Sequence, residues 1–488
     1  MNVFEKLEPQ LVWNYFYEIT QIPRPSKKEG KIIQYLLDFG KKHNLLTKRD
    51  EIGNVLIFKP ATKGFEDRKM VVLQSHIDMV CEKNSDVVHD FDNDPIKPYI
   101  DGEWVKAKGT TLGADDGIGI AAQLAVLASN NLEHGDLECL FTVDEETGLS
   151  GAFALQSGFM NGKILLNLDS EDEGELYIGC AGGIDTVVKM KIDKKDEVLS
   201  DDIALKISLT GLNGGHSGDD IFKGLANAVK LMNRILWQGT QKFNLRLHTF
   251  NAGNLRNALA REAFAYFVVN KEVKDAFLNF FAKLSQDIKN EFAITEKNMT
   301  FLCEDAELPS WVLHKTVQHN LLNSLYACPH GMMSMSQQIA GLVETSTNLA
   351  SVKFLDEETI QITTSQRSSV ESAKKDIAAM VASVFNMVGA NATHSEGYPG
   401  WSPNRNSEIL NISEKAYIYL FEQQPKVKAI HAGLECGLFL EKYPYLDMIS
   451  FGPTIKGAHS PDERINIETV DKFWKLLLEI LKNIPANS

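Results

Sequence analysis

Paired or clustered cysteines are missing from this sequence. Its 488 residues include 6 cysteines, and none of them has the CxxC spacing that is typical of a zinc knuckle or a redox pair. Their scatter also disagrees with the disulfide framework of a small secreted protein. We therefore expect reduced thiols in a cytoplasmic protein.

Long apolar runs are equally absent. No stretch reaches the roughly 18 consecutive apolar residues that a membrane-spanning helix needs. The amino-terminal segment alternates charged with aromatic residues and lacks the basic and apolar regions of a signal peptide. We therefore expect neither a membrane segment nor export.

An excess of positive charge is lacking as well. The formal net charge of -15 repels phosphate backbones and anionic lipid surfaces, so neither nucleic acid nor a membrane is an expected partner. An acidic chain can instead attract cations. With 44% hydrophobic and 24% charged residues the composition is that of a globular protein, and the length favours two domains over one.

The first part of the chain alternates short β-rich runs with helical patterns. Ser26 stands three residues before Glu29, so a capping box is predicted to open a helix that ends near residue 43. Residues 117–130 predict another helix. This alternation predicts an α/β domain with a mixed, largely parallel sheet. The β-rich runs are NVLIF (54–58), MVVLQ (70–74), LECLFTV (137–143) and KILLNL (163–168).

The pattern changes near residue 187 and changes back near residue 397. Between them, longer amphipathic stretches are separated by strand pairs, which indicates an α+β domain. We therefore predict one domain from residues 1–187 and 398–488, with residues 188–397 inserted as a second domain. The amphipathic stretches are 221–236, 273–291 and 370–387, and the strand pairs are 245–251 with 262–269 and 348–355 with 358–366.

Acidic and imidazole side chains follow several predicted strands. SHID (75–78), DEETG (144–148) and LDSEDEGE (168–175) each come at the end of a β-rich run, and Asp115 lies in a glycine-flanked loop before a helix. Ligands of open α/β sheets bind beyond the carboxyl ends of the strands, so these side chains are expected to converge. Taken singly, each carboxylate is more often solvated or a helix cap.

Glu145 and Glu146 are adjacent at the end of a buried strand. Two uncompensated carboxylates there repel each other and are costly to desolvate, and a divalent cation offsets that cost. Imidazole and carboxylate ligands suit zinc, cobalt and manganese. His216 and His459 both lie in turns rich in glycine and serine, where the backbone can aim a side chain at a site.

Seven motifs occur in order along nearly the whole chain. They are SHIDMV, GTTLGADDGIG, DEETGLSGA, LNLDSEDEGE, GGHSG, HAGLECG and GAHSPDE. Together they resemble the di-zinc peptidase family that includes carnosinases, peptidase T and peptidase V. The resemblance implies a two-domain metallopeptidase whose inserted domain is a lid that binds substrate and forms a homodimer.

By this resemblance the protein binds two divalent ions, with zinc expected and cobalt or manganese as alternatives. The implied ligands are His76 and Asp169 for one ion, Glu146 and His459 for the other, and Asp115 as the bridge between them.

Two further acidic residues receive roles from the same resemblance. Glu145 is the implied general base, and Asp78 is implied to hydrogen-bond the imidazole of His76 and fix its tautomer. Asp116 departs from relatives that can carry asparagine after the bridging aspartate, and its charge is expected to alter the local electrostatics slightly.

Four residues are implied to contact the substrate. His216 matches a lid histidine that polarises the scissile carbonyl, while Asn257 and Arg367 match groups that hold the substrate. Gly433, in HAGLECG, matches a loop of the catalytic domain near the substrate's carboxylate. Without the resemblance, an arginine on a strand is most often a solvated charge and Asn257 a turn cap.

The resulting hypothesis is a metal-dependent dipeptidase that cleaves Xaa-His dipeptides, including beta-Ala-His. Two metal ions would activate water, with Glu145 accepting its proton. N-acyl amino acid deacylases and tripeptide aminopeptidases use the same constellation and remain alternatives. A catalytically inactive metal-binding protein is a further alternative, but the intact Glu145 argues against it.

Overall fold

The computed structural model describes residues 2–487, which form two compact units. Unit 1 comprises Met1–Cys180, Pro403–Ala429 and Leu434–Ser488, and unit 2 comprises Ala181–Ser402 and Ile430–Gly433. The sequence prediction divided the chain after residues 187 and 397. The two units instead divide after Cys180 and Ser402, and residues 430–433 also belong to unit 2, where the Ala181 amide donates to the carbonyls of Ile430 and Ala432.

Unit 1 is built on an eight-stranded mixed sheet with the order β1-β2-β6-β3-β7-β21-β8-β20. Its four central strands β6, β3, β7 and β21 are parallel, and antiparallel strands flank them. β3 and β6 are buried along their whole length, as expected of central parallel strands covered on both faces. The strands are β1 Leu46–Arg49, β2 Val55–Lys59, β3 Val71–His76, β6 Leu137–Thr142, β7 Ile164–Asn167, β8 Glu175–Cys180, β20 Lys426–Ile430 and β21 Asp447–Ser450.

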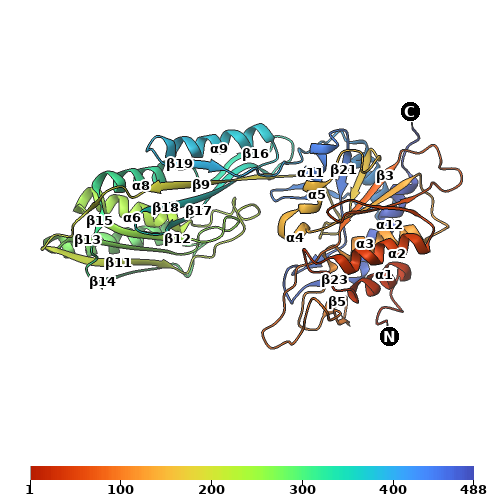
Figure 1. Ribbon diagram of the computed structural model, residues 1–488, viewed down its shortest axis with the longest axis horizontal. Coiled ribbons are helices and arrows are strands. Elements are labelled where there is room, and N and C mark those ends of the chain that lie inside the picture. Colours follow the sequence, from red (N-terminus) through yellow and green to blue (C-terminus); the bar gives the residue numbers. More distant parts are fainter. Residues whose placement is uncertain (1, 488) are drawn as a thin grey trace. The chain divides into compact units, whose positions relative to one another are not determined.

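Helices and a small sheet complete unit 1. α3 packs on β3 and is covered in turn by α1, so α3 is apolar nearly all round (Figure 1). A four-stranded sheet has the order β22-β23-β5-β4. The helices are α1 Gln10–Thr20, α2 Gly30–Lys42, α3 Ala114–Ala128, α4 Glu145–Gly148, α5 Ser150–Ala154, α10 Glu408–Phe421, α11 Glu435–Lys442 and α12 Ile467–Lys482, and the small sheet contains β4 Pro98–Asp101, β5 Trp104–Ala107, β22 Ile455–Lys456 and β23 Arg464–Asn466.

The capping box predicted at the start of α2 is not formed. The helix begins at Gly30 without a side-chain cap. The Ser26 hydroxyl instead donates to Asp78 Oδ2 at 2.7 Å, and Glu29 Oε1 accepts from the amides of Lys27 and Asp144. Both side chains are therefore used to hold loops near the ends of β3 and β6.

Unit 2 is built on a nine-stranded sheet. Eight strands have the order β14-β11-β13-β12-β17-β18-β9-β19, β16 pairs with β17, and every neighbouring pair is antiparallel. A separate short pair joins β10 to β15. The strands are β9 Gly182–Lys191, β10 Lys195–Asp196, β11 Asp202–Thr210, β12 Arg246–Gly253, β13 Ala263–Asn270, β14 Thr300–Ala306, β15 Val312–Leu313, β16 Gly331–Met335, β17 Val343–Phe354, β18 Thr359–Ser368 and β19 Asn391–His394.

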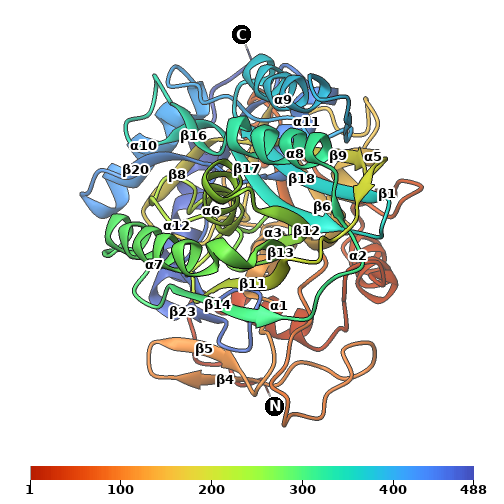
Figure 2. The ribbon, with the colours of Figure 1, turned by 90° about the vertical axis from the view of Figure 1, so that its left-hand side faces the viewer.

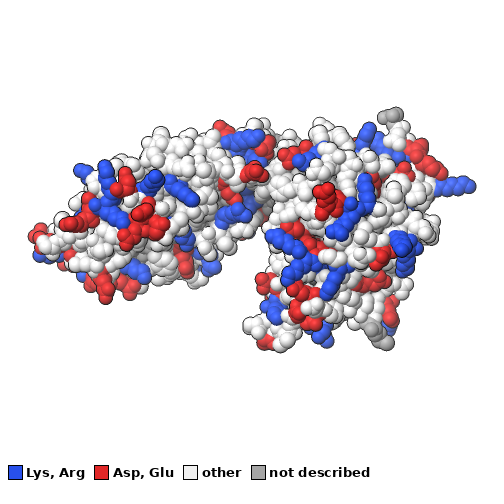
Figure 3. Space-filling model, in the orientation of Figure 1, with Lys and Arg blue, Asp and Glu red and all other residues white. Residues whose placement is uncertain are grey.

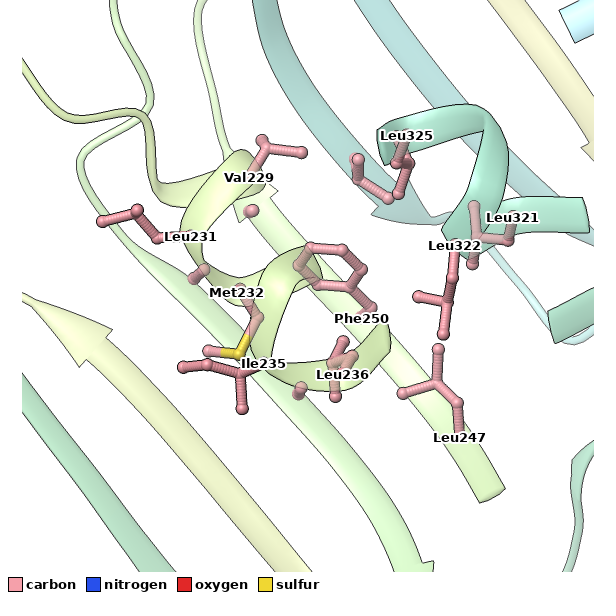
Figure 4. Close-up of a cluster of buried hydrophobic side chains, with 14 of the residues drawn as sticks. Val229, Leu231, Met232, Ile235, Leu236, Leu247, Phe250, Leu321, Leu322 and Leu325 are labelled. Atoms are coloured by element: carbon pink, nitrogen blue, oxygen red, sulfur yellow. The ribbon is translucent and has the colours of Figure 1, made fainter. Parts of the chain in front are cut away.

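A row of helices covers this sheet. α6 lies between α7 and α8, and α8 also contacts α9 (Figure 2). Leu236 of α6, Phe250 of β12 and Leu322 of α8 belong to one apolar core (Figure 4). The predicted helix at 221–236 begins later, because Asn227 caps the amide of Lys230. The helices are α6 Ala228–Phe243, the 3-10 helix η1 Lys271–Val273, α7 Lys274–Glu291, α8 Lys315–Ala327 and α9 Glu371–Asn386.

Charged side chains of both signs are interspersed over the visible face of each unit (Figure 3). Within residues 2–487, no helix has the length and apolarity required to cross a membrane.

Candidate metal centre and substrate-binding cluster

The five predicted metal ligands all lie in unit 1, and three of them, His76, Glu146 and Asp169, lie at or just beyond the carboxyl ends of its parallel strands. Asp144, at a φ of 50°, turns the chain sharply from β6 into α4 and so presents the two glutamates that follow it. The ligands lie at the end of β3 (His76), in the first turn of α3 (Asp115), in α4 (Glu146), after β7 (Asp169) and after β22 (His459).

Asp115 lies between two histidines. Its Oδ1 is 3.0 Å from His76 Nε2, and its Oδ2 is 3.2 Å from His459 Nε2. A carboxylate that presents one oxygen to each of two imidazoles has the geometry needed to bridge two cations. The structure therefore supports a bridging position for Asp115.

Each histidine faces a second carboxylate. His76 Nε2 lies 3.4 Å from Asp169 Oδ1, and His459 Nε2 lies 3.0 Å from Glu146 Oε2. Two groups of possible ligands share Asp115: His76 with Asp169, and Glu146 with His459. One imidazole and two carboxylates per group form a donor set that divalent transition metals accept.

The electrostatics of these histidines fit a cation site. Burial lowers the pKa of His76, but the charge of Asp169 and hydrogen bonds to the facing carboxylates raise it well above its usual value. Hydrogen bonds to Asp115 and Glu146 raise the pKa of His459 to about 11. Without metal, protons on the imidazoles balance the carboxylates, and metal binding would replace those protons.

Glu145 is next to a ligand but is not part of either group that contains Asp115. Burial raises the pKa of its carboxyl group well above the usual value, and the charges of Asp169, Glu435 and Glu146 add to this effect. A carboxyl group with a raised pKa can both accept and return a proton near neutral pH.

Asp78 contacts both His76 and the backbone of the two glutamates. It is fully buried, its Oδ1 lies 3.3 Å from His76 Nδ1, and its two oxygens accept the backbone amides of Glu145 and Glu146 at 3.0 and 3.2 Å. Burial raises the pKa of Asp78, but His76 and the hydrogen bond from Ser26 lower it to about 2. One carboxylate thus orients both a histidine and the α4 backbone.

Two residues that the sequence reading missed hold the loop before Asp115. Glu463, which is 2% exposed, accepts the amides of Leu112, Gly113 and Ala114 at 2.7 to 2.9 Å. Buried Arg24 donates to the carbonyls of Ile77, Asp78 and Gly113. The position of Glu463 just after GAHSPD is a signal that could have identified it, whereas no motif singles out Arg24.

Asp116, the acidic residue that follows Asp115, is buried. Its side chain is 1% exposed and its Oδ1 accepts the Gly119 amide at 3.2 Å. Burial, followed by the charge of Asp169, raises the pKa of Asp116 well above its usual value.

Unit 2 brings the predicted Arg367 into a cluster of its own. The side chain is 7% exposed, yet no ion pair with a carboxylate holds it among the described residues. Its Nε donates to Ser217 Oγ at 3.3 Å, and its Nη1 donates to the Tyr398 hydroxyl at 2.9 Å. A buried guanidinium held by neutral groups is well suited to pair with a carboxylate ligand.

His216 lies beside Ser217 in the same unit. Its Nδ1 accepts the amides of Gly218 and Asp219 at 3.3 Å and lies 3.4 Å from Asp219 Oδ2. A neutral ring whose Nδ1 accepts these amides carries its proton on Nε2. That proton makes Nε2 a hydrogen-bond donor. The Asn257 carbonyl accepts the Ser217 amide at 2.8 Å, while the Asn257 side chain is exposed.

Gly433 and His431 complete this cluster in unit 2. A Cβ atom at Gly433 would come 2.9 Å from the Tyr398 ring, so glycine permits the close approach. His431, which sequence reasoning did not single out, places Nε2 2.7 Å from Ser346 Oγ, and Ser346 lies opposite Arg367 across β17 and β18. Burial, followed by the Arg367 charge, lowers the pKa of His431 to about 4.

These two groups of residues can be set beside known proteins. A model of peptidase family M20/M25/M40 matches residues 72–483. The chain belongs to this peptidase family. It is therefore a hydrolase of the metallopeptidase type, and the mixed-sheet, two-domain architecture expected from the sequence is confirmed.

Relatives in this family include dipeptidases. The chain is 45% identical over 486 residues to the cytosol non-specific dipeptidase of Escherichia coli, covering 100% of both chains. It is 44% identical to the crystal structure of aminoacylhistidine dipeptidase from Vibrio alginolyticus, with a TM-score of 0.92 and 99% of each chain covered. The resemblance of the seven motifs is thereby confirmed. Aminopeptidase PepT from Bacillus cereus, at 16% identity and a TM-score of 0.57, shares the fold.

Proposed function

We propose that this chain is a dipeptidase that uses two divalent metal ions. The observation that carries the proposal is the position of Asp115, whose two oxygens each face a histidine that also faces a second carboxylate. The names of the two similar dipeptidases support the substrate class. One of them is named a non-specific dipeptidase and the other an aminoacylhistidine dipeptidase. A preference for Xaa-His dipeptides, including beta-Ala-His, is therefore a second and more specific proposal.

The proposed ligands are those of the two groups that share Asp115. His76 and Asp169 would hold one ion, Glu146 and His459 would hold the other, and zinc is the expected metal, with cobalt and manganese as alternatives. When bound, the two ions supply Lewis-acid polarisation of the peptide carbonyl and acidify water.

Glu145 is the proposed general base. Its buried carboxyl group would accept a proton from the attacking water and return it to the leaving amine. Asp78 would keep His76 in the tautomer that leaves Nε2 free for metal, since its carboxylate lies against Nδ1.

The cluster in unit 2 is proposed to bind the dipeptide. Arg367 would pair with its free carboxylate, since the guanidinium lacks such a partner. His216 would donate from Nε2 to the carbonyl oxygen, and Asn257 and Gly433 would line the substrate. A homodimer through unit 2 is proposed from the resemblance alone. The name of the cytosol non-specific dipeptidase of Escherichia coli supports a cytoplasmic location.

Elemental analysis combined with a substrate panel tests the proposal. The panel contains Ala-His, beta-Ala-His, dipeptides without histidine, acetyl-amino acids and tripeptides. We expect about two metal ions per chain, dipeptide hydrolysis that chelation removes, and recovery with divalent metal. Full activity in metal-free protein would contradict the metal site, and preferential cleavage of acetyl-amino acids or tripeptides would contradict the dipeptidase assignment.

A further inference from the structure

A row of polar side chains crosses the centre of the sheet in unit 1. Gln74, Asn167 and Ser450 face one another in register on β3, β7 and β21, and all three are fully buried. Asn167 Nδ2 donates to Gln74 Oε1 at 2.6 Å, and Ser450 Oγ donates to Asn167 Oδ1. Burying amides in a sheet is costly unless they are paired, so this row is a specific feature that apolar residues would not replace.

Glu435 closes one end of the row. It is the first residue of α11 and is 1% exposed. Its Oε2 accepts from Gln74 Nε2 and from Thr142 Oγ1, each at 2.7 Å. Its Oε1 is buried without a hydrogen-bond partner among the described residues. Burial raises the pKa of the Glu435 carboxyl group to about 8.

The row lies directly beneath the metal centre. His76 follows Gln74 by two residues on β3, and Asp169 follows Asn167 by two residues at the end of β7. At the far end of the row, Ser450 Oγ lies 2.6 Å from the hydroxyl of Ser170, the residue after Asp169. The side-chain hydrogen bonds thus fix the relative positions of the two strand ends that carry the ligands.

We infer that Glu435 is a positioning residue of the metal centre, which through Gln74 and Asn167 holds His76 and Asp169 at the spacing that binds metal. The backbone ladder between β3 and β7 reaches Gln74 and Asn167, where the Leu168 amide donates to the Gln74 carbonyl at 3.0 Å. The side-chain row adds a second set of hydrogen bonds at this last paired position, two residues before each ligand. Residues that orient metal ligands without touching the metal typically contribute about 10- to 100-fold to metal affinity. The inference rests on the proposed metal site.

Glu138 offers a matched control in the same sheet. It is 2% exposed and lies on β6, four residues before Thr142. Its carboxylate accepts the amides of Asn161 and Gly162 at 2.7 and 3.0 Å, away from the row. Replacing it removes buried hydrogen bonds from a carboxylate without touching Glu435 or its partners.

The experiment measures the zinc dissociation constant by competition with a chelator for wild type, Glu435→Ala, Glu435→Gln and Glu138→Ala, together with the melting temperature of each metal-free protein. We expect Glu435→Ala to bind zinc about 10- to 100-fold more weakly. Glu435→Gln should stay within about 3-fold of wild type, because the amide oxygen can accept the two hydrogen bonds that Oε2 of Glu435 accepts. Glu138→Ala should lower the melting temperature but keep wild-type affinity.

Wild-type zinc affinity in folded Glu435→Ala would overturn the inference, and so would equal weakening in Glu138→Ala or in Glu435→Gln. If Glu435→Ala does not fold, Thr142→Val replaces it, since it keeps the side-chain size and removes one donor to Glu435. We then expect about tenfold weaker binding, and unchanged affinity would overturn the inference. Failure of wild type itself to bind metal would instead reject the proposed function.

Discussion

The two histidines of the candidate metal centre in unit 1 and two buried histidines of unit 2 lie in opposite electrostatic surroundings. His76 and His459 in unit 1 face carboxylates that raise their pKa values, so both attract a positive charge. In unit 2, burial and the neighbouring cations Lys230 and Arg367 lower the pKa values of His330 and His431 to about 4. The carboxylates of the first arrangement favour bound cations, and the second arrangement favours a neutral imidazole close to a lysine or arginine side chain.

The contrast indicates how the work of a dipeptidase can be divided. Carboxylates that would repel a peptide's terminal carboxylate are concentrated in the unit that binds metal. The guanidinium that can pair with that carboxylate belongs to the other unit, where neutral groups hold it. If the division is correct, variants of unit 1 should affect metal and chemistry, while variants of the cluster in unit 2 should affect discrimination between substrates.

The largest expected effect comes from the base in unit 1. Glu145→Gln keeps the shape of the side chain but cannot accept a proton, so turnover should fall by roughly two to four orders of magnitude with both metal ions retained. Glu146→Gln should instead weaken metal binding. Kinetics and metal content measured on the same samples test this. Identical behaviour of the two variants would show that base and ligand are not separate roles.

Arg367 is the corresponding test in unit 2. Loss of a charge-assisted contact costs about 1.5–3 kcal/mol, so Arg367→Ala should lower kcat/KM on Ala-His roughly 10- to 150-fold. Arg367→Lys should restore only part of kcat/KM, because an ammonium group lacks the planar guanidinium that can donate two parallel hydrogen bonds to a carboxylate. Wild type should prefer Ala-His over its amide, and the alanine variant should lose most of that preference.

The control for this variant is Arg234→Ala. Arg234 also belongs to unit 2, but it pairs at the surface with Glu291 at 2.7 and 2.9 Å. Its removal should leave kcat/KM and the preference for the free acid unchanged. Equal wild-type rates on Ala-His and its amide would show that the protein does not recognise the free carboxylate. That result would contradict the proposal that unit 2 discriminates between substrates.

Much of the fold followed from periodicity. The predicted runs at 70–74 and 163–168 correspond to β3 and β7, and the helix predicted at 273–291 corresponds to α7 within one residue. The capping box failed because Ser26 has a tertiary partner, Asp78, that lies 52 residues away in the chain. Local patterns cannot report such competition.

Some residues of the candidate site could likewise be predicted from local sequence patterns, and others could not. Proposed ligands such as His76 could be predicted, because they follow apolar strands and belong to motifs. The roles of Gln74 and Asn167 could not be predicted, since a single polar residue within an apolar strand usually faces solvent. Their role depends on strands that are neighbours in space but distant in sequence, β3 and β7. Only the register across the sheet reveals the row.

A pH experiment sharpens the comparison of the histidines. The pKa of His330 is lowered by burial and by Lys230 to about 4, against a usual value of about 6.5 when unfolded. As the pH falls, the unfolded chain binds a proton at His330 before the folded protein does, and this favours unfolding. The contribution of the neutral, buried His330 to the free energy of unfolding is therefore complete above pH 6.5 and is lost as the pH falls toward 4. Between pH 7 and pH 5 the loss from this residue is about 2 kcal/mol.

His330→Asn should remove that dependence. The asparagine oxygen can replace Nδ1 as the acceptor for the Leu349 amide, which donates at 3.2 Å. Urea unfolding of wild type and variant at pH 7 and pH 5 measures the difference. The variant should lose about 2 kcal/mol less than wild type on acidification, and an equal loss in both would show that His330 already binds a proton in the folded protein.

The smallest expected effect concerns the support of the guanidinium. Tyr398→Phe removes the hydroxyl that accepts from Arg367 Nη1 at 2.9 Å and leaves the charge and Ser217 in place. Because one hydrogen bond contributes about 0.5–1.5 kcal/mol, kcat/KM on Ala-His should fall roughly 2- to 10-fold. The preference for Ala-His over Ala-His amide should also become smaller. Tyr326→Phe, at a half-exposed position of unit 2, should change neither value. If Tyr398→Phe lowered the rates on acid and amide equally, the hydroxyl would support the fold of unit 2 and not the orientation of Arg367 toward a carboxylate.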